Sequence, residues 1–265
     1  MSNFTIASYL SLLAAVCVLL CGCARQNVNQ LMQQAYSAAQ RGDLGEAEQL
    51  TAQCLQANAN YLDAKLLNEY CRFSRHSQES DRKQALYNLS KCTIIASDNL
   101  NCWLFYGWAL VESGQTHEAI AVLKRAEALL PAKGGPRAQI QLLLGRCYVE
   151  NNLQNEALAI LQPLQLRMPY REWPELYNSL GMLALKRRQN DHAIRFFKEG
   201  LRHAPGNDVL LRNLAVVYDV YVNDPVQARH YYLECLRRAK DRRDDAMAQR
   251  LARRLGQLGR QIVKK

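Results

Sequence analysis

The sequence predicts an all-α protein, a solenoid of about six helical hairpins that ends in a capping helix. Three observations support this fold class. The 265 residues include only 13 Gly and 7 Pro, and an all-β fold uses these turn-forming residues freely. Small residues return at a regular spacing over most of the chain. The last segment carries one apolar stripe at helical spacing.

The repeated spacing is clearest between Leu100 and Lys133. Here Gly107 is followed after 12 residues by Ala119, after 7 more by Ala126 and after 5 more by Pro131. The same spacing fits Gly145, Ala157, Leu164 and Pro169, then Gly181, Ala193, Gly200 and Pro205, and also Ala35, Ala47, Cys54 and Ala59. It fits Ala215, Ala228 and Cys235 with one extra residue assigned to the turn 223–225, and Asn68, Ala85 and Cys92 with five extra residues around 75–80. One such hairpin cannot bury its apolar face alone, so the repeats are expected to stack.

This pattern, with Trp103, Tyr106 and Gly107 in the third repeat, resembles the tetratricopeptide repeat family. The small residues let two antiparallel helices approach, and proline ends the second helix because it has no amide hydrogen. The resemblance implies a right-handed superhelix with a concave inner face. It places the repeat domain at 31–241, in six repeats of about 28–61, 62–99, 100–133, 138–171, 174–207 and 208–241.

The C-terminal segment, residues 242–265, is predicted to be a basic amphipathic capping helix. A solenoid needs a terminal helix with one polar face to cover its last repeat. The predicted apolar stripe is Ala246, Met247, Leu251, Leu255, Leu258 and Ile262. The basic residues of its polar face include Arg250, Arg253, Arg254 and Arg260.

The net charge of +10 is concentrated near this helix. Residues 236–265 contain 11 Lys and Arg against 3 Asp, a net of +8, which leaves +2 for the rest of the chain. Three interpretations compete: a solvated face of the cap, contact with anionic lipid, or docking to an acidic patch on a partner. Nucleic acid is not expected as a partner, because no recognition fold accompanies the charge.

The first 22 residues contain no Asp, Glu, Lys or Arg and carry an apolar run from Ile6 to Leu20. A run this short is typical of a signal peptide rather than a membrane span of about 20 residues. It leads into Leu20-Cys21-Gly22-Cys23, which resembles the lipobox of bacterial lipoproteins. The resemblance implies removal of residues 1–22, a covalent lipid on Cys23 and a polar tether over residues 23–30. An uncleaved N-terminal anchor is the alternative.

The lipobox resemblance also implies a location. Ala24 after the lipidated cysteine favours the outer membrane, with the body of the protein facing the periplasm. A triacylated amino terminus would hold the protein almost permanently, whereas one acyl chain binds only marginally. No cofactor is expected other than the lipid on Cys23.

The sequence carries no motif typical of an enzyme or a metal site. It lacks a Gly-rich phosphate loop, a Gly-x-Ser-x-Gly elbow and a His-Glu-x-x-His pair. The five histidines stand apart at His76, His117, His192, His203 and His230. We therefore expect a non-enzymatic binding protein.

Six cysteines follow the predicted lipidation site: Cys54, Cys71, Cys92, Cys102, Cys147 and Cys235. Cys54, Cys92 and Cys235 occupy the repeat's small-residue position, which predicts buried thiols that pack as small apolar residues. A disulfide between Cys71 and Cys92, on the two helices of one repeat, is the alternative.

The concave face implied by the repeat family supplies the candidate partner-binding residues. They are Leu104, Trp108, Val111, Leu142, Arg146, Asn178, Met182, Arg212 and Val216. Trp108 is the first choice as an anchor, because a large rigid aromatic side chain in a groove is a frequent hot spot. The alternative is that Trp108 and Leu142 pack against neighbouring repeats as core residues.

A lipobox followed by about six tetratricopeptide repeats resembles the lipoproteins that assist pilus assembly, including type IV pilus pilotins and their tight-adherence counterparts. The resemblance implies a scaffold whose groove holds a secretin or another component of a pilus or secretion machine. Two alternatives stay open. One is an accessory lipoprotein of outer-membrane protein insertion or of cell-wall enzyme regulation, and the other is an intracellular interaction module with an uncleaved anchor.

Overall fold

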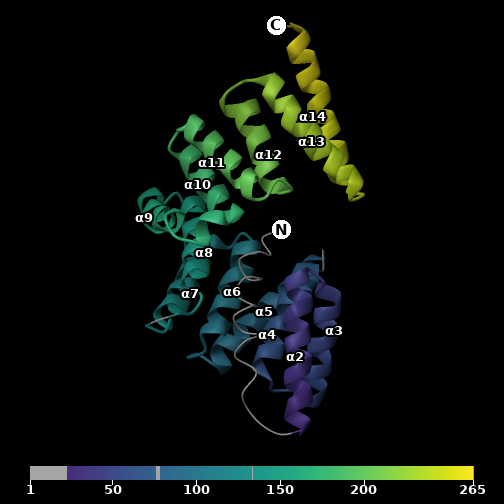
Figure 1. Cartoon of the computed structure of the whole chain (residues 1–265), viewed down its shortest axis with the longest axis vertical. Helices are drawn as coiled ribbons and strands as arrows, with labels where there is room; N and C mark the ends of the chain where they lie inside the picture. The colour runs from purple at the N-terminus through teal and green to yellow at the C-terminus, as the bar shows by residue number, and fades with distance from the viewer. Residues whose placement is uncertain (1–22, 76–77, 133, 265) are drawn as a thin grey trace. The chain divides into compact units, whose positions relative to one another are not determined.

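The computed structural model describes residues 23–75, 78–132 and 134–264 (Figure 1). These ranges contain thirteen α-helices and no strand, which confirms the all-helical prediction for them. The predicted signal peptide, residues 1–22, lies outside the described residues. So do His76 and Ser77 of the insertion expected in the second repeat.

Each of the six predicted repeats contains two helices in the structure. The bounds are α2 Cys23–Arg41, α3 Leu44–Ala57, α4 Leu62–Arg75, α5 Glu79–Ile95, α6 Leu100–Glu112, α7 Thr116–Ala128, α8 Arg137–Glu150, α9 Gln154–Gln165, α10 Pro174–Lys186, α11 Asn190–His203, α12 Asp208–Val216, α13 Pro225–Asp241 and α14 Asp245–Lys264. A 3-10 turn spans Tyr170–Glu172 (η2), and a π-helical turn spans Val217–Tyr221 (η3). The chain divides into two compact bodies, one up to Cys147 and one from Tyr148.

In the first body, helices that follow one another in sequence pack together from α2 to α7. The tether expected at residues 23–30 is helical and forms the first turns of α2. The five extra residues of the second repeat are absorbed as helix on both sides of its turn, because α4 continues to Arg75 and α5 begins six residues before Ala85. In the regular repeats the second helix begins three residues before the equivalent alanine.

In the second body, two apolar clusters follow one another along the chain. One is built around Phe197 between α10, α11 and α12, and the other around Tyr232 between α12, α13 and α14. Leu251 and Leu258 of α14 are buried in the second cluster, so α14 covers the apolar side of α13 (Figure 1).

Five of the turns between the two helices of a repeat each contain one residue with a left-handed backbone. In four repeats this residue lies seven positions after the first small residue of the repeat. These four are Gly42, Gly114, Asn152 and Arg188. In the last repeat the equivalent residue is Asn223, with φ of 57°, and it lies eight residues after Ala215. Ala228 then follows five residues later, as in the other repeats.

The extra residue of the last repeat therefore lies inside the first helix and not in the turn 223–225, where the spacing had placed it. A π-helical turn adds one residue to a helix without breaking it. Here the Val222 amide donates to the Val217 carbonyl at 3.0 Å, across five residues. This correction matters for the site below, because the π-turn carries Tyr218 and Asp219.

The six cysteines that follow Cys23 are buried and form no disulfide. The prediction of buried thiols is confirmed for them, and the alternative Cys71–Cys92 bridge is absent. Burial raises the pKa of Cys54 and Cys235 to about 11, so these thiols stay protonated at neutral pH.

Replacement of Gly181 by alanine is predicted to destabilise the second body, because the added Cβ would overlap the Phe197 ring. Overpacking of this kind costs about 1–3 kcal/mol in the free energy of unfolding. Gly256→Ala is the matched control: its Cβ would meet nothing within 4 Å in the middle of α14, so it should stabilise by up to about 1 kcal/mol. Urea unfolding followed by circular dichroism measures both, and equal effects of the two substitutions would contradict the close-approach argument.

Candidate functional site

Four of the predicted groove residues in the first body are buried: Leu104, Trp108, Val111 and Leu142. Trp108 is only 2% exposed, and its ring centroid lies 4.7 Å from that of Tyr70 and 5.2 Å from that of Phe73. Aromatic contacts at these distances are typical of a packed core. The structure therefore places Trp108 and Leu142 in the core, as the alternative interpretation held, and Trp108 is not an exposed anchor.

Arg146, the fifth predicted residue in the first body, is partly exposed on α8. Its guanidinium donates to a carboxylate oxygen of Glu112 at 2.7 Å. The charge of Arg146 is thus already matched within the fold.

The four predicted residues in the second body retain exposed surface. Asn178 of α10 accepts a hydrogen bond at 2.7 Å from the side-chain amide of Asn213 on α12. Met182 and Val216 are half-buried against the two apolar clusters. Arg212 is exposed and has no carboxylate partner among the described residues. Of the whole predicted set, Arg212 is the side chain best placed to meet a partner.

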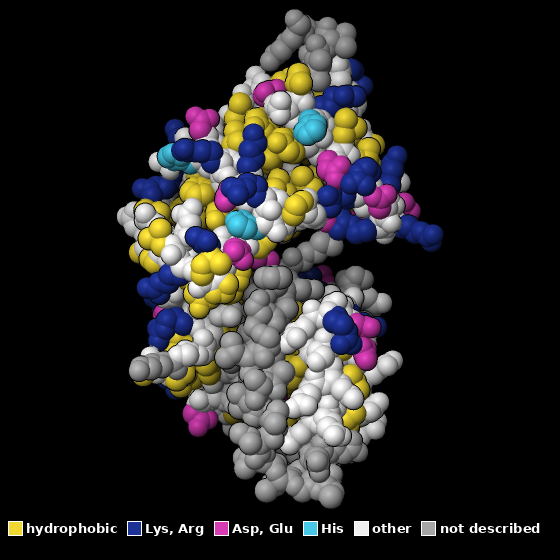
Figure 2. Space-filling model, in the orientation of Figure 1, with side chains coloured by type: hydrophobic (Ala, Val, Ile, Leu, Met, Phe, Trp, Pro, Cys, Tyr) yellow, Lys and Arg dark blue, Asp and Glu magenta, His cyan; other side chains and the backbone are white. Residues whose placement is uncertain are grey.

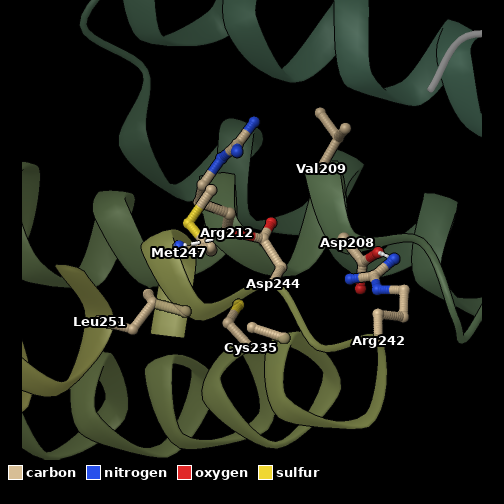
Figure 3. A pocket seen from close by; sticks show the side chains of 9 residues that line it. Asp208, Val209, Arg212, Cys235, Arg242, Asp244, Met247 and Leu251 are labelled. Atoms are coloured by element: carbon tan, nitrogen blue, oxygen red, sulfur yellow. Dashed lines mark hydrogen bonds and ion pairs between the residues drawn. The ribbon is translucent and has the colours of Figure 1, made fainter. Parts of the chain in front are cut away.

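Arg212 lines a pocket of 360 Å³ between α12, α13 and α14 (Figure 3). The lining residues are Asp208, Val209, Arg212, Cys235, Ala239, Arg242, Asp244, Met247 and Leu251. Residue spacing in the sequence did not reveal this pocket, because its wall comes from three helices and from the turn between two of them.

Local sequence explains how the three helices present these residues. Asn207 caps α12 by accepting from the amides of Val209 and Leu210, both at 3.1 Å, a frequent role for Asn. Asp208 and Arg212 then stand one turn apart on α12. After α13, Asp244 caps α14 by accepting from the Met247 amide at 3.0 Å. Met247 and Leu251, four residues apart, therefore face the same side of α14.

The pocket has an apolar floor and a charged rim. Cys235, Ala239 and Leu251 are buried at the floor. At one side of the rim the Arg242 guanidinium pairs with the Asp208 carboxylate, and the Arg212 guanidinium points away from Cys235 (Figure 3). Such a site can hold an apolar side chain next to an anionic group, and burial, which raises the pKa of Cys235, disfavours the nucleophilic thiolate there.

A second feature of this body fixes α14 in place. The Nε atom of Arg254 donates to Asp219 Oδ2 at 2.7 Å, and a second nitrogen of the same guanidinium donates to Oδ1. The Tyr232 hydroxyl also donates to Oδ2, at 3.2 Å. The Asp219 side chain is 3% exposed, so its charge is held by these contacts alone among the described residues.

This pairing corrects the prediction for the basic helix. Arg254 is not part of a solvated basic face, because its guanidinium forms an ion pair with Asp219. Arg250, Arg253 and Arg260 are exposed, as expected for a solvated face. Helical periodicity could have distinguished Arg254 from the other three arginines. Arg254 follows Leu251 by three residues, so it lies beside the apolar stripe of the helix.

Within the described residues, no group of three or more His, Cys, Asp or Glu could hold a metal ion. Among the helices of those same residues, none is both long and apolar enough to cross a membrane.

Comparison with known proteins agrees with this fold. Residues 110–177 match the model of the tetratricopeptide repeat family. PilW, described as a widely conserved type IV pilus biogenesis factor, is 16% identical with a TM-score of 0.62, and the match covers 85% of this chain and 98% of that one. PilF of Pseudomonas aeruginosa is 19% identical with a TM-score of 0.57, over 87% of this chain and 99% of that one. No curated protein sequence matches the chain.

A chain of the APC/C hetero-tetramer Cut9–Hcn1 is also similar, at 16% identity and a TM-score of 0.68, over 94% of this chain and 47% of that one. Identities this low show a shared fold and not a shared function. The fold is that of tetratricopeptide repeat proteins, scaffolds that mediate protein–protein interaction.

Arg254→Ala is predicted to lower the free energy of unfolding by about 2–3 kcal/mol, because it leaves the Asp219 carboxylate buried without its cation. The loss should be smaller than for a fully buried pair, since Arg254 is 35% exposed. Arg253→Ala is the matched control: it removes the same charge from the same helix but touches an exposed side chain. Equal stability of the two variants in urea unfolding would show that the ion pair does not hold α14.

Proposed function

We propose that this protein is a lipid-anchored scaffold at the periplasmic face of the outer membrane, and that it assists assembly of a pilus or secretion machine. The lipid is attached to Cys23, and the repeats bind a protein partner without catalysing a reaction. A secretin, or another component of such a machine, is the proposed partner.

The observation that carries partner binding is the pocket between α12, α13 and α14. Its apolar floor suits one apolar side chain of a bound segment, and Arg212 at the rim suits a neighbouring carboxylate. Preformed apolar pockets with a few polar groups at the edge are the usual form of binding sites. The pocket thus replaces Trp108 as the proposed anchor point of the partner.

The likeness to PilW and PilF supports the pilus part of the proposal. This chain spans 98% and 99% of those two chains, so the shared architecture extends over their whole length. The lipobox-like Leu20-Cys21-Gly22-Cys23 supports the anchor and the location.

Cys23→Ala is predicted to abolish incorporation of radiolabelled palmitate, since the thiol is the proposed acceptor of the lipid. Cys21→Ala, two residues away, is the matched control and should keep the label. Cell fractionation should move the Cys23→Ala protein out of the outer-membrane fraction. Label retained in Cys23→Ala would refute the lipoprotein assignment.

A photo-crosslinking amino acid at Met247, on the wall of the pocket, is predicted to give an intermolecular product in cells. The same amino acid at Ile94, which is 71% exposed on α5 in the other body, serves as the control and should not give that product. Mass spectrometry of the product identifies the partner. Only intramolecular products from Met247, or the same product from both positions, would show that the pocket is not the docking site.

A further inference from the structure

The turn between α12 and α13 exposes an unusual run of apolar side chains. Val220, Tyr221 and Val222 are 65%, 49% and 41% exposed, and Val226 in the first turn of α13 is 60% exposed. Single exposed apolar residues are common, but contiguous ones mark interaction surfaces. These side chains are exposed because the π-turn ends the regular α-helix at Val216.

Basic residues border these apolar side chains. Lys186, Arg187 and Arg188 are consecutive and exposed at the end of α10 and in the turn after it. The two turns touch, because the side-chain amide of Asn190 donates to the Tyr221 carbonyl at 3.1 Å. Arg188 and Val222 also line one shallow pocket of 440 Å³.

We call this combined surface the turn edge. It consists of Lys186, Arg187, Arg188, Val220, Tyr221, Val222, Val226 and the exposed Arg229. On the face shown in Figure 2, hydrophobic and basic side chains lie next to one another over α10–α13.

The turn edge has a net positive charge, with four basic side chains against two nearby acids, Asp191 and Asp224. Its four basic side chains have no carboxylate partner among the described residues. Asp191 lines the same shallow pocket as Arg188 but forms no ion pair with it. The Asp224 carboxylate caps α13 by accepting from the amides of Val226 and Gln227 at 3.1 Å and 3.0 Å, so it is held by the backbone and is not paired with a cation.

We propose that the turn edge contacts an anionic phospholipid surface. Lipid phosphates attract Lys and Arg side chains, and Tyr with aliphatic neighbours fits the boundary between headgroups and acyl chains. This contact is separate from the proposed lipid on Cys23 and uses side chains of the folded body. This contact would orient the second body at the membrane in which the lipid on Cys23 is inserted.

The capping helix is a poorer membrane surface than the turn edge, although it holds more charge. Its buried leucines, Leu251 and Leu258, are packed in the cluster around Tyr232. Among the described side chains of residues 245–260, no large hydrophobic one is exposed to accompany Arg250, Arg253 and Arg260. Charge alone gives a weak, strongly salt-dependent attraction.

The test is vesicle sedimentation of residues 23–265 carrying Cys23→Ser, a form that contains every described helix and no lipid. Circular dichroism first establishes that this form and each variant are folded. We expect binding to vesicles of phosphatidylcholine mixed with phosphatidylglycerol, and no binding to phosphatidylcholine alone. Added salt should weaken the binding, because it screens the exposed charges.

Two triple variants locate the contact. Lys186→Gln with Arg187→Gln and Arg188→Gln should lower binding about 100-fold, since each basic residue near the surface contributes about fivefold. Val220→Ser with Tyr221→Ser and Val222→Ser should also lower it at least tenfold, at unchanged charge. The control for charge is Arg250→Gln with Arg253→Gln and Arg260→Gln, and the control for exposed apolar surface is Ile94→Ser with Ile95→Ser. Both controls should bind like the parent form.

Absence of vesicle binding by the parent form would overturn the proposal and would leave the turn edge as a surface for an anionic protein. Loss of binding in the α14 variant, with the turn-edge variants unaffected, would also overturn it by placing the contact on the cap. Neither result would alter palmitate labelling at Cys23 or crosslinking at Met247, so the two proposals fail independently.

Discussion

The close approach of neighbouring helices at small side chains, both within a repeat and between successive repeats, is the constraint on which the other features depend. A Cβ at Gly107 would lie 2.6 Å from the Leu123 side chain, and one at Gly200 would lie 2.7 Å from that of Leu210. Because interiors are packed at the density of organic crystals, such positions tolerate no added atom without movement of their neighbours. The spacing of small residues therefore fixes how the helices stack, and the stacking decides which side chains remain exposed.

A single added residue in the last repeat alters that regular arrangement. The π-turn at Val217–Tyr221 places Asp219 where Arg254 and Tyr232 reach it, while Val220, Tyr221 and Val222 are exposed. One local insertion thus links two observations: α14 is fixed by a charge pair, and the neighbouring turn carries the exposed apolar run. π-turns are rare and are frequently found at functional sites, which agrees with both roles.

Three groups of basic residues have different physical roles. Arg146 and Arg254 are paired within the fold. Arg250, Arg253 and Arg260 form a solvated face of the cap. Arg212 and the basic residues of the turn edge have no carboxylate partner among the described residues, and Arg212 and Arg188 each share a pocket with apolar side chains. Net charge by itself could not distinguish these groups, because it carries no information on pairing.

The sequence by itself determined the helical fold, the six pairs of helices and the amphipathic character of the last helix, because small-residue spacing and apolar periodicity are local properties that survive in any arrangement of the repeats. The tertiary structure decided which side chains are accessible. Leu104 and Arg212 occupy the same position of the repeat pattern, three residues before the small residue, yet Leu104 is buried and Arg212 is exposed beside a pocket. Accessibility depends on what an adjacent helix places against a residue, and that contact joins positions far apart in the sequence.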